Sequence, residues 1–212
     1  MNFQKCIQIA IIIILAILII ILFFNRGSRF SISNITRRTG IDGLEYRVHN
    51  LHTKTVDEPG VELGSSEYIL SKLNNTAITL LKHLKYSNNV NSSQSMISRL
   101  LRYYNPDNLV ENSPKNIEGD TSYTYNDGST LALCLRKHNT HDLHDINTLT
   151  FVFIHELAHI SIPDAGHPPK FWNAFKRLLL DSNSIGLIEL VNYSQYPVKY
   201  CGMTISSNPV FS

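Results

Sequence analysis

The sequence is poor in cysteine. Cys6, Cys134 and Cys201 are the only cysteines among its 212 residues, and Cys6 borders a long apolar run. The rest of the chain can therefore form at most one pair. Small domains that depend on disulfides carry a much denser set of cysteines. The sequence thus excludes a disulfide framework as the basis of the fold.

The chain also lacks a strong excess of charge of either sign. It has 19 Lys and Arg against 17 Asp and Glu, which gives a formal net charge of +2. Proteins that bind nucleic acid usually carry a basic face or stripe, and none is visible here. No nucleic-acid partner is indicated. With 43% hydrophobic residues, the composition is that of a globular protein with room for one catalytic domain.

The most informative motif is H-E-x-x-H, formed by His155, Glu156 and His159. Residues four apart lie on the same face of a helix, so both imidazoles can reach one metal ion. Glu156, beside them, is placed to hold a water molecule at the metal. Three protein ligands and one position left for water are typical of catalytic Zn²⁺. The motif therefore predicts one zinc ion per chain, with Glu156 as the catalytic residue.

The residues around the motif are apolar on nearly every side. Between Phe151 and Ile160, all positions outside the motif are Phe, Val, Ile, Leu or Ala. This pattern predicts a buried helix. Unpaired polar groups in such a helix cost roughly 1 to 3 kcal/mol each, and a bound metal would satisfy them. The alternative is a core helix with hydrogen-bonded histidines.

The third metal ligand has three candidates. His167 follows a turn whose proline and glycine end the helix, and it would complete a three-histidine site. Asp164 lies nearer in the same turn. Glu189 would serve if a glutamate from a later helix closed the site. His167 is favoured by its ligand type and its reach.

Three further histidines, His138, His141 and His144, lie in the polar segment before the motif helix. Histidines in such a loop usually belong to a solvated turn, and a second metal site is the alternative. Asn147 or Thr148 is predicted to cap the motif helix.

Periodicity places the other elements. Apolar residues at helical spacing predict helices over residues 67–86, with Ser65 or Ser66 as cap, and over residues 96–104. Residues 129–136 form the clearest strand, and residues 123–125 are predicted to pair with it as a hairpin. The 129–136 strand could present an exposed edge to an extended peptide. An ordinary core strand fits the sequence equally well.

Residues 7–24 are almost entirely apolar, interrupted by Gln8. This length is at the lower edge of what spans a bilayer. The run predicts a membrane anchor at residues 1–29, followed by a tether at residues 30–65 with one short strand near 44–48. The folded domain is then expected over residues 66–212.

Two alternatives to an anchor are a cleaved signal peptide and a buried core helix. The run exceeds a normal signal core, and residues 25–29 do not resemble a cleavage site. A core helix is disfavoured because no face of the run is polar. Orientation follows from positive charge: Lys5 lies on one side, and the other side carries Arg26, Arg29, Arg37 and Arg38. The positive-inside rule predicts a single-pass membrane protein with a cytoplasmic domain.

One segment resembles the compact zinc peptidases of the WLM and SprT-like group, including YgjP-like proteins. It runs from HELAH through a short turn to His167 and Pro168, and then to the Phe-Trp pair. The resemblance covers roughly residues 130–180. It implies a minimal α+β zincin fold, a small sheet packed on helices, with His155, His159 and His167 as zinc ligands and Glu156 as general base. The composition, rich in Ile and Asn, is typical of AT-rich genomes such as those of large DNA viruses.

These observations together predict a membrane-anchored zinc metallopeptidase acting on a peptide or protein substrate. Tyr193, Tyr196 and Tyr200 are candidate donors to the oxyanion of the reaction, with aromatic packing as the alternative. A catalytically silent scaffold that binds a protein partner at the membrane is the second hypothesis. An intact Glu156 argues against it, because a scaffold needs no general base. A structural membrane protein with a chance motif is the third.

Overall fold

The computed structural model describes most of the chain after residue 34, and every structural statement below concerns that part. The described segments are residues 35–49, 65–87, 94–112 and 121–212. Within them, residues Thr36 to Ser212 form one compact unit.

The predicted localisation has to be corrected. Within the described segments, no helix is both long and apolar enough to cross a membrane. The apolar run at residues 7–24, and with it the predicted anchor at residues 1–29, lies outside the described residues. The finding contradicts the prediction of a single-pass membrane protein with a cytoplasmic domain, and that prediction is not carried further.

A five-stranded sheet has the strand order β1-β2-β3-β5-β4. Its strands are β1 (Ile35–Thr39), β2 (Glu45–His49), β3 (Leu109–Glu111), β4 (Tyr123–Tyr125) and β5 (Thr130–Leu133). β3 runs parallel to β2 and to β5, whereas β4 is antiparallel to β5. β5 is therefore an interior strand, and β4 lies at the edge of the sheet.

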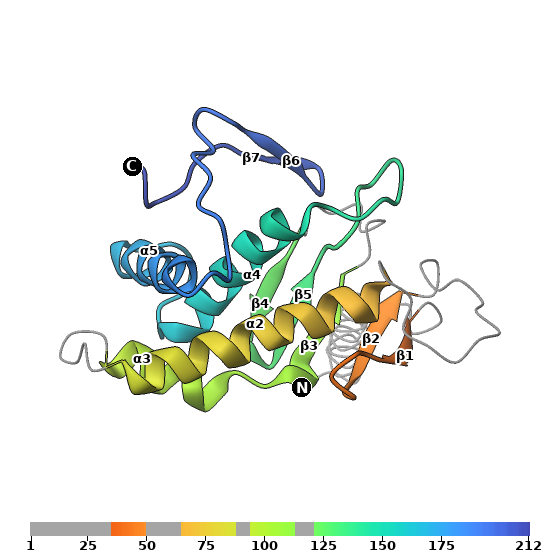
Figure 1. Cartoon of the computed structure of the whole chain (residues 1–212), viewed down its shortest axis with the longest axis horizontal. Helices are drawn as coiled ribbons and strands as arrows, with labels where there is room; N and C mark the ends of the chain where they lie inside the picture. The colour runs from red at the N-terminus through yellow and green to blue at the C-terminus, as the bar shows by residue number, and fades with distance from the viewer. Residues whose placement is uncertain (1–34, 50–64, 88–93, 113–120) are drawn as a thin grey trace, which may run out of the picture. The chain divides into compact units, whose positions relative to one another are not determined.

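Four α-helices are present in the described residues: α2 (Ser66–Tyr86), α3 (Gln94–Tyr103), α4 (Ile146–Ser161) and α5 (Pro169–Ser184). A separate antiparallel hairpin of β6 (Val198–Tyr200) and β7 (Met203–Ile205) follows α5. In Figure 1, α2 crosses the sheet and α4 is drawn between α2 and this hairpin. The predicted α+β class is confirmed.

The helix that carries the H-E-x-x-H motif is buried, as its apolar composition predicts. α4 contacts α2, α3, α5 and β4. Phe153, Ile154 and Leu157 on it have no exposed surface. The polar motif residues are thus held by a helix that the core fixes on several sides.

The predicted cap of α4 is wrong. Asp145 is the N-cap, and its carboxylate accepts the Thr148 backbone N–H at 3.0 Å. Thr148 lies in the first turn, where backbone N–H groups need an external acceptor. Asn147 instead pairs with the backbone of Glu189 through both its amide nitrogen and its amide oxygen. The predicted cap of α2 is confirmed, because the Ser65 side chain accepts the Tyr68 N–H.

Part of the segment expected to be a tether belongs to the sheet. β2 corresponds to the strand predicted near residues 44–48, and β1 precedes it. Tyr46 and Val48 of β2 are buried in the core. Residues 50–64 lie outside the described residues. The folded unit therefore includes residues N-terminal to position 66.

Candidate metal centre

Three histidines converge at the end of α4. His155 and His159 share a face of the helix, which ends at Ser161. The following turn, with Gly166 at φ 73°, leads to His167. The Nε2 atom of His155 lies 3.3 Å from Nε2 of His159 and 3.1 Å from Nε2 of His167. One helix and the turn after it thus direct three ring nitrogens to a common point.

The spacing of these nitrogens fits tetrahedral zinc. With Zn–N distances of about 2.05 Å, two ligand nitrogens of a tetrahedral site lie about 3.3 Å apart. Hydrogen bonding alone accounts for the cluster less well. A neutral imidazole has a single N–H, whereas His155 Nε2 faces two other ring nitrogens. The donor set and its geometry suit one Zn²⁺ ion.

The environment keeps these histidines in the form that binds metal. Burial, reinforced by the neighbouring histidines, lowers the pKa of His155 to about 3. Burial and the proximity of His167 lower the pKa of His159 to about 4. Burial also lowers the pKa of His167. Metal binding requires neutral imidazole, so around pH 7 all three are ready to act as ligands.

The other two candidates for the third ligand lie elsewhere. The Asp164 carboxylate borders the same cavity but is paired with Nζ of Lys170 at 3.7 Å. Glu189 is held by its backbone beside Asn147, at the opposite end of α4. Of the three candidates, the structure brings His167 together with His155 and His159, all within 4.8 Å of one another.

Glu156 lies beside the histidines and is almost completely buried, with 3% of its surface exposed. Burial raises its carboxyl pKa to about 7, and a hydrogen bond from Thr124 partly opposes this rise. A carboxyl group with a pKa near the working pH can both accept and return a proton. Glu156 also borders the cavity that the histidines line. Its placement therefore suits proton transfer to and from a reactant.

Thr124 is a contact that the sequence interpretation missed. Its Oγ1 donates a hydrogen bond to Oε2 of Glu156 at 2.9 Å. Thr124 belongs to β4, which the sequence did predict as a hairpin partner of the next strand. Nothing in the sequence links it to a glutamate 32 positions later. The hydroxyl orients the buried carboxylate, so Thr124 is a positioning residue.

Under the peptidase function proposed below, Thr124→Val should lower peptide hydrolysis by about 10-fold, because it leaves Glu156 without the hydrogen bond that orients it. Bound zinc should stay unchanged, since no metal ligand is altered. Thr130→Val is the matched control: it makes the same change on the neighbouring strand, outside the cavity. Steady-state kinetics and zinc analysis of both variants check the prediction. Equal activities would exclude the positioning role.

A cavity of about 670 Å³ opens over the histidines. β4 forms one wall through Tyr123 and Thr124, and α5 contributes Trp172 and Phe175. The segment from β6 through residue 207 forms another wall. Three separate parts of the chain thus enclose the space above the three histidines.

The edge strand beside this cavity is β4. The sequence suggested that the strand at residues 129–136 could present an exposed edge to a peptide. The structure excludes this role for it, because β5 is paired on both sides, with β3 and with β4. In the described residues β4 has β5 as its single neighbour. Among the described strands, the side of β4 that faces away from β5 therefore takes the position expected of a peptide-binding edge.

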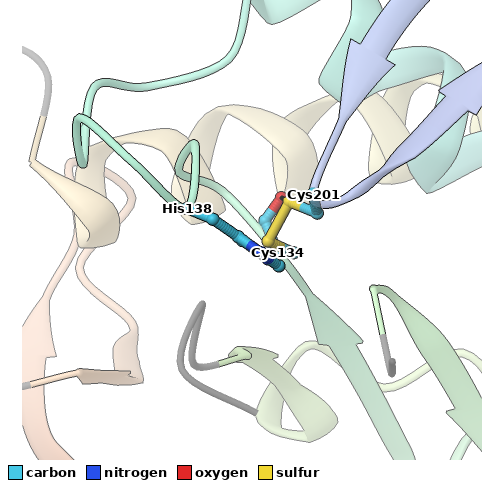
Figure 2. Close-up of side chains that lie close together, drawn as sticks. All are labelled: Cys134, His138 and Cys201. Atoms are coloured by element: carbon cyan, nitrogen blue, oxygen red, sulfur yellow. Dashed lines mark hydrogen bonds between the residues drawn. A yellow bond between two sulfur atoms is a disulfide. The ribbon is translucent and has the colours of Figure 1, made fainter. Parts of the chain in front are cut away.

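The three loop histidines do not all gather at one place. His141 is exposed in a turn at φ 59°. His138 instead lies with Cys134 and Cys201, as Figure 2 shows. These cysteines form the one pair that the sequence allowed in the folded part. His144 is buried next to the same pair.

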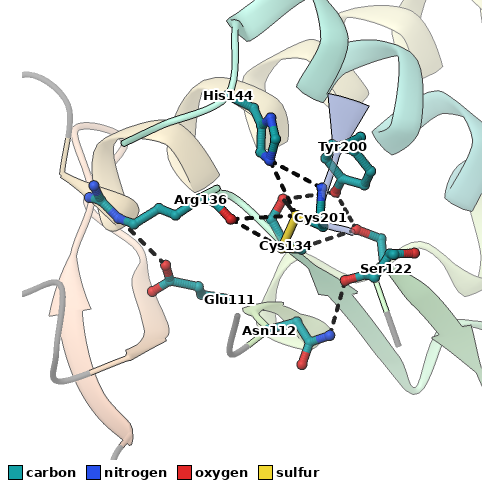
Figure 3. Close-up of a disulfide and its surroundings, with 9 residues drawn as sticks. Glu111, Asn112, Ser122, Cys134, Arg136, His144, Tyr200 and Cys201 are labelled. Atoms are coloured by element: carbon teal, nitrogen blue, oxygen red, sulfur yellow. Dashed lines mark hydrogen bonds and ion pairs between the residues drawn. A yellow bond between two sulfur atoms is a disulfide. The ribbon is translucent and has the colours of Figure 1, made fainter. Parts of the chain in front are cut away.

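Three tyrosines were predicted as candidate oxyanion donors. The structure places two of them outside the cavity, and the hydroxyl of the third is already hydrogen-bonded. Tyr193 is buried against Phe151, with ring centroids 4.8 Å apart, and Tyr196 is 69% exposed; neither lines the cavity. Tyr200 does line it, but its hydroxyl donates to the Cys134 carbonyl at 2.8 Å and contacts Ser122 (Figure 3). An oxyanion role would require this hydroxyl to leave the Cys134 carbonyl.

No family model matches this chain. An uncharacterized protein of Acanthamoeba polyphaga mimivirus is 29% identical over 202 residues, covering 94% of this chain and 95% of that protein. An uncharacterized protein of Invertebrate iridescent virus 6 is 38% identical over 74 residues, which cover 34% of this chain and 41% of that protein. An uncharacterized protein of Invertebrate iridescent virus 3 is 40% identical over 72 residues, which cover 34% of this chain and 44% of that protein. The chain thus spans nearly all of the first relative and less than half of the other two. These viral relatives agree with the viral hypothesis drawn from composition.

Solved structures of Wss1 are similar to this fold. That of Saccharomyces cerevisiae has a TM-score of 0.41 at 19% identity and covers 55% of this chain and 76% of that one. The structure of a Wss1 mutant from S. pombe has a TM-score of 0.31 at 21% identity; the match covers 51% of this chain and 86% of that one. The resemblance to the WLM and SprT-like group therefore stays a prediction from the sequence. At TM-scores this low, the functional argument rests on the site itself.

Proposed function

We propose that this protein is a zinc-dependent metallopeptidase that hydrolyses peptide bonds with an activated water molecule. The observation that carries the proposal is the convergence of the Nε2 atoms of His155, His159 and His167 beside the buried carboxyl of Glu156. Structural zinc sites usually close the ion with a fourth protein ligand. Among the described residues, no fourth His, Cys or carboxylate joins this group. The arrangement therefore supports a catalytic site.

The roles of the residues follow from their positions. His155, His159 and His167 would hold the ion. Bound Zn²⁺ supplies Lewis-acid polarisation of the scissile carbonyl and makes water more acidic. Glu156 accepts a proton from the attacking water and then donates it to the leaving amine. Thr124 keeps the Glu156 carboxylate directed toward the reactants throughout.

An extended peptide is the substrate form that best fits the cavity. Such a peptide can add to a sheet edge through backbone hydrogen bonds. β4, the outer strand of the described sheet, borders the same cavity as Glu156 and the histidines. A peptide paired with β4 would therefore pass close to Glu156. We assign β4 as the substrate-aligning strand in this proposal.

Metal analysis combined with a peptide-cleavage assay tests the proposed function. With the Cys134–Cys201 disulfide intact, the full chain should hold about one zinc per molecule and cleave unstructured peptides. Removing the ion with a chelator should abolish cleavage and lower the thermal unfolding temperature, because metal binding is coupled to folding. Zinc added back should restore both. Undiminished cleavage after verified metal removal would refute the proposal.

A further inference from the structure

A second group of metal-ligating side chains lies outside the histidine centre. Cys134 directly follows β5, His138 lies in the next loop, and Cys201 occupies the turn between β6 and β7. One ligand atom from each lies within 4.8 Å of the others. Figure 2 shows the His138 imidazole extending toward the two sulfur atoms, which form a disulfide.

A fourth candidate ligand, His144, comes from the segment just before α4. Its Nε2 atom lies 3.4 Å from Sγ of Cys201 and accepts the Cys201 backbone N–H at 3.3 Å. His144 is buried, with 6% of its surface exposed. Figure 3 shows its ring directed at Cys201. Two thiol-bearing residues and the His138 imidazole therefore meet at one place. His144 borders this place beside Cys201, and its Nε2 atom would exchange the Cys201 N–H for a metal ion.

The hairpin turn is shaped to admit His138. Gly202 has φ +85°, and a Cβ atom at this position would lie 3.3 Å from Cε1 of His138. A side chain here would crowd the imidazole and would also be strained by the backbone conformation. Glycine at this position thus lets His138 approach the sulfur atoms closely.

Two cysteines and two histidines are a common ligand set of structural zinc sites. A disulfide, by contrast, needs neither histidine. We propose that Cys134, His138, His144 and Cys201 bind a structural Zn²⁺ ion when the Cys134–Cys201 disulfide is reduced. With Zn–S distances of about 2.3 Å, the two sulfurs would lie about 3.8 Å apart. The Cα atoms are 6.4 Å apart, which leaves the side chains room to open to this separation.

Thiol–disulfide exchange frees the two cysteines for the ion. A dithiol reduces the disulfide by thiol–disulfide exchange: the S–S bond breaks, and two electrons and two protons pass to the cysteines while the dithiol becomes a disulfide. Zn²⁺ then displaces the two thiol protons and binds the thiolates. A small-molecule disulfide reverses the sequence: it takes two electrons from the two cysteine thiolates and becomes two thiolates, the Cys134–Cys201 bond forms again, and the ion is released.

The link between Cys134 and Cys201 also holds one wall of the cavity in place. Cys201 anchors the β6–β7 hairpin to the end of β5, across a sequence separation of 67. Met203, Thr204 and Ile205 of the same hairpin line the cavity. Closing so long a loop stabilises the folded arrangement, whether the link is a disulfide or a metal ion. The hairpin is therefore held in place under both oxidising and reducing conditions.

Cobalt binding to the full chain tests the proposal. Cys6→Ser leaves Cys134 and Cys201 as the only cysteines. A trialkylphosphine reduces the disulfide: phosphorus takes an oxygen from water, and the two protons of that water go to the thiols. After bound zinc has been removed with a chelator, the reduced protein should take up about two Co²⁺ ions and show thiolate-to-cobalt absorption. The oxidised protein, treated in the same way, should take up about one and show none. Only sulfur ligands produce this absorption, so the result does not depend on the histidine centre or on peptidase activity.

His138→Asn and His141→Asn form a matched pair, since both residues are exposed histidines of the same loop. His138→Asn should weaken cobalt binding at the cysteines by 10-fold or more, on the order expected for a lost contact at a metal site. His141→Asn should leave it unchanged. If the reduced protein carries two free thiols but shows no thiolate-to-cobalt absorption, the proposal fails. Equal effects of the two variants would remove His138 from the site.

Discussion

Glu156→Gln is expected to lower peptide hydrolysis by roughly 100-fold or more while leaving the bound zinc in place. Gln has nearly the shape of Glu, and its amide can still bond to the Thr124 hydroxyl. It cannot accept a proton from water, however. Glu156 is also not one of the three converging metal ligands. The loss should therefore appear in kcat, with little change in metal content, as measured by steady-state kinetics and zinc analysis.

Glu67→Gln provides the control for this variant. It makes the same chemical change on α2, at a residue that does not line the cavity. Its activity should equal that of the wild type. If Glu156→Gln retains full activity under the same conditions, another group must be the general base. If the variant also loses zinc, the defect lies in the metal centre and the assigned proton transfer is not supported.

The part of the site that the sequence predicted depends on local geometry. His155 and His159 lie one helical turn apart, so the period of the helix alone places them on one face. The apolar residues around them predict that α4 is buried, and its contacts with the sheet and three helices agree. The α2 helix was predictable for the same reason, because its apolar stripe and the Ser65 cap are both local signals.

The features that the sequence did not predict depend on contacts between distant segments. The bond from Thr124 to Glu156 requires β4 to lie at the sheet edge beside α4, and periodicity gives no strand order. The pairing of β5 on both sides follows from the same strand order. The N-cap of α4 was misassigned because Asp145 and Asn147 are both good capping residues. The backbone of Glu189, far along the chain, engages Asn147.

Replacing His167 with Ala is expected to weaken zinc binding by about 100-fold or more, because it removes one of three protein ligands. His167 reaches the other two histidines from an exposed turn, with its Nε2 3.1 Å from that of His155. Its ring also stacks on Trp172, with centroids 5.5 Å apart, which holds the imidazole in position. The exposed location means that the substitution leaves no cavity in the core. A loss of zinc affinity would therefore report on ligation and not on misfolding, which circular dichroism can verify.

Asp164→Ala and Glu189→Ala are the matched comparisons, since each removes another candidate for the third ligand. Asp164 lies in the same turn but faces Lys170, and Glu189 lies beside Asn147 at the far end of α4. Both variants should keep zinc affinity within a few-fold of the wild type. Competition with a chromogenic chelator measures all three affinities on one scale. An unchanged affinity in His167→Ala would remove His167 from the site. A large loss in one of the other variants would identify the ligand that replaces it.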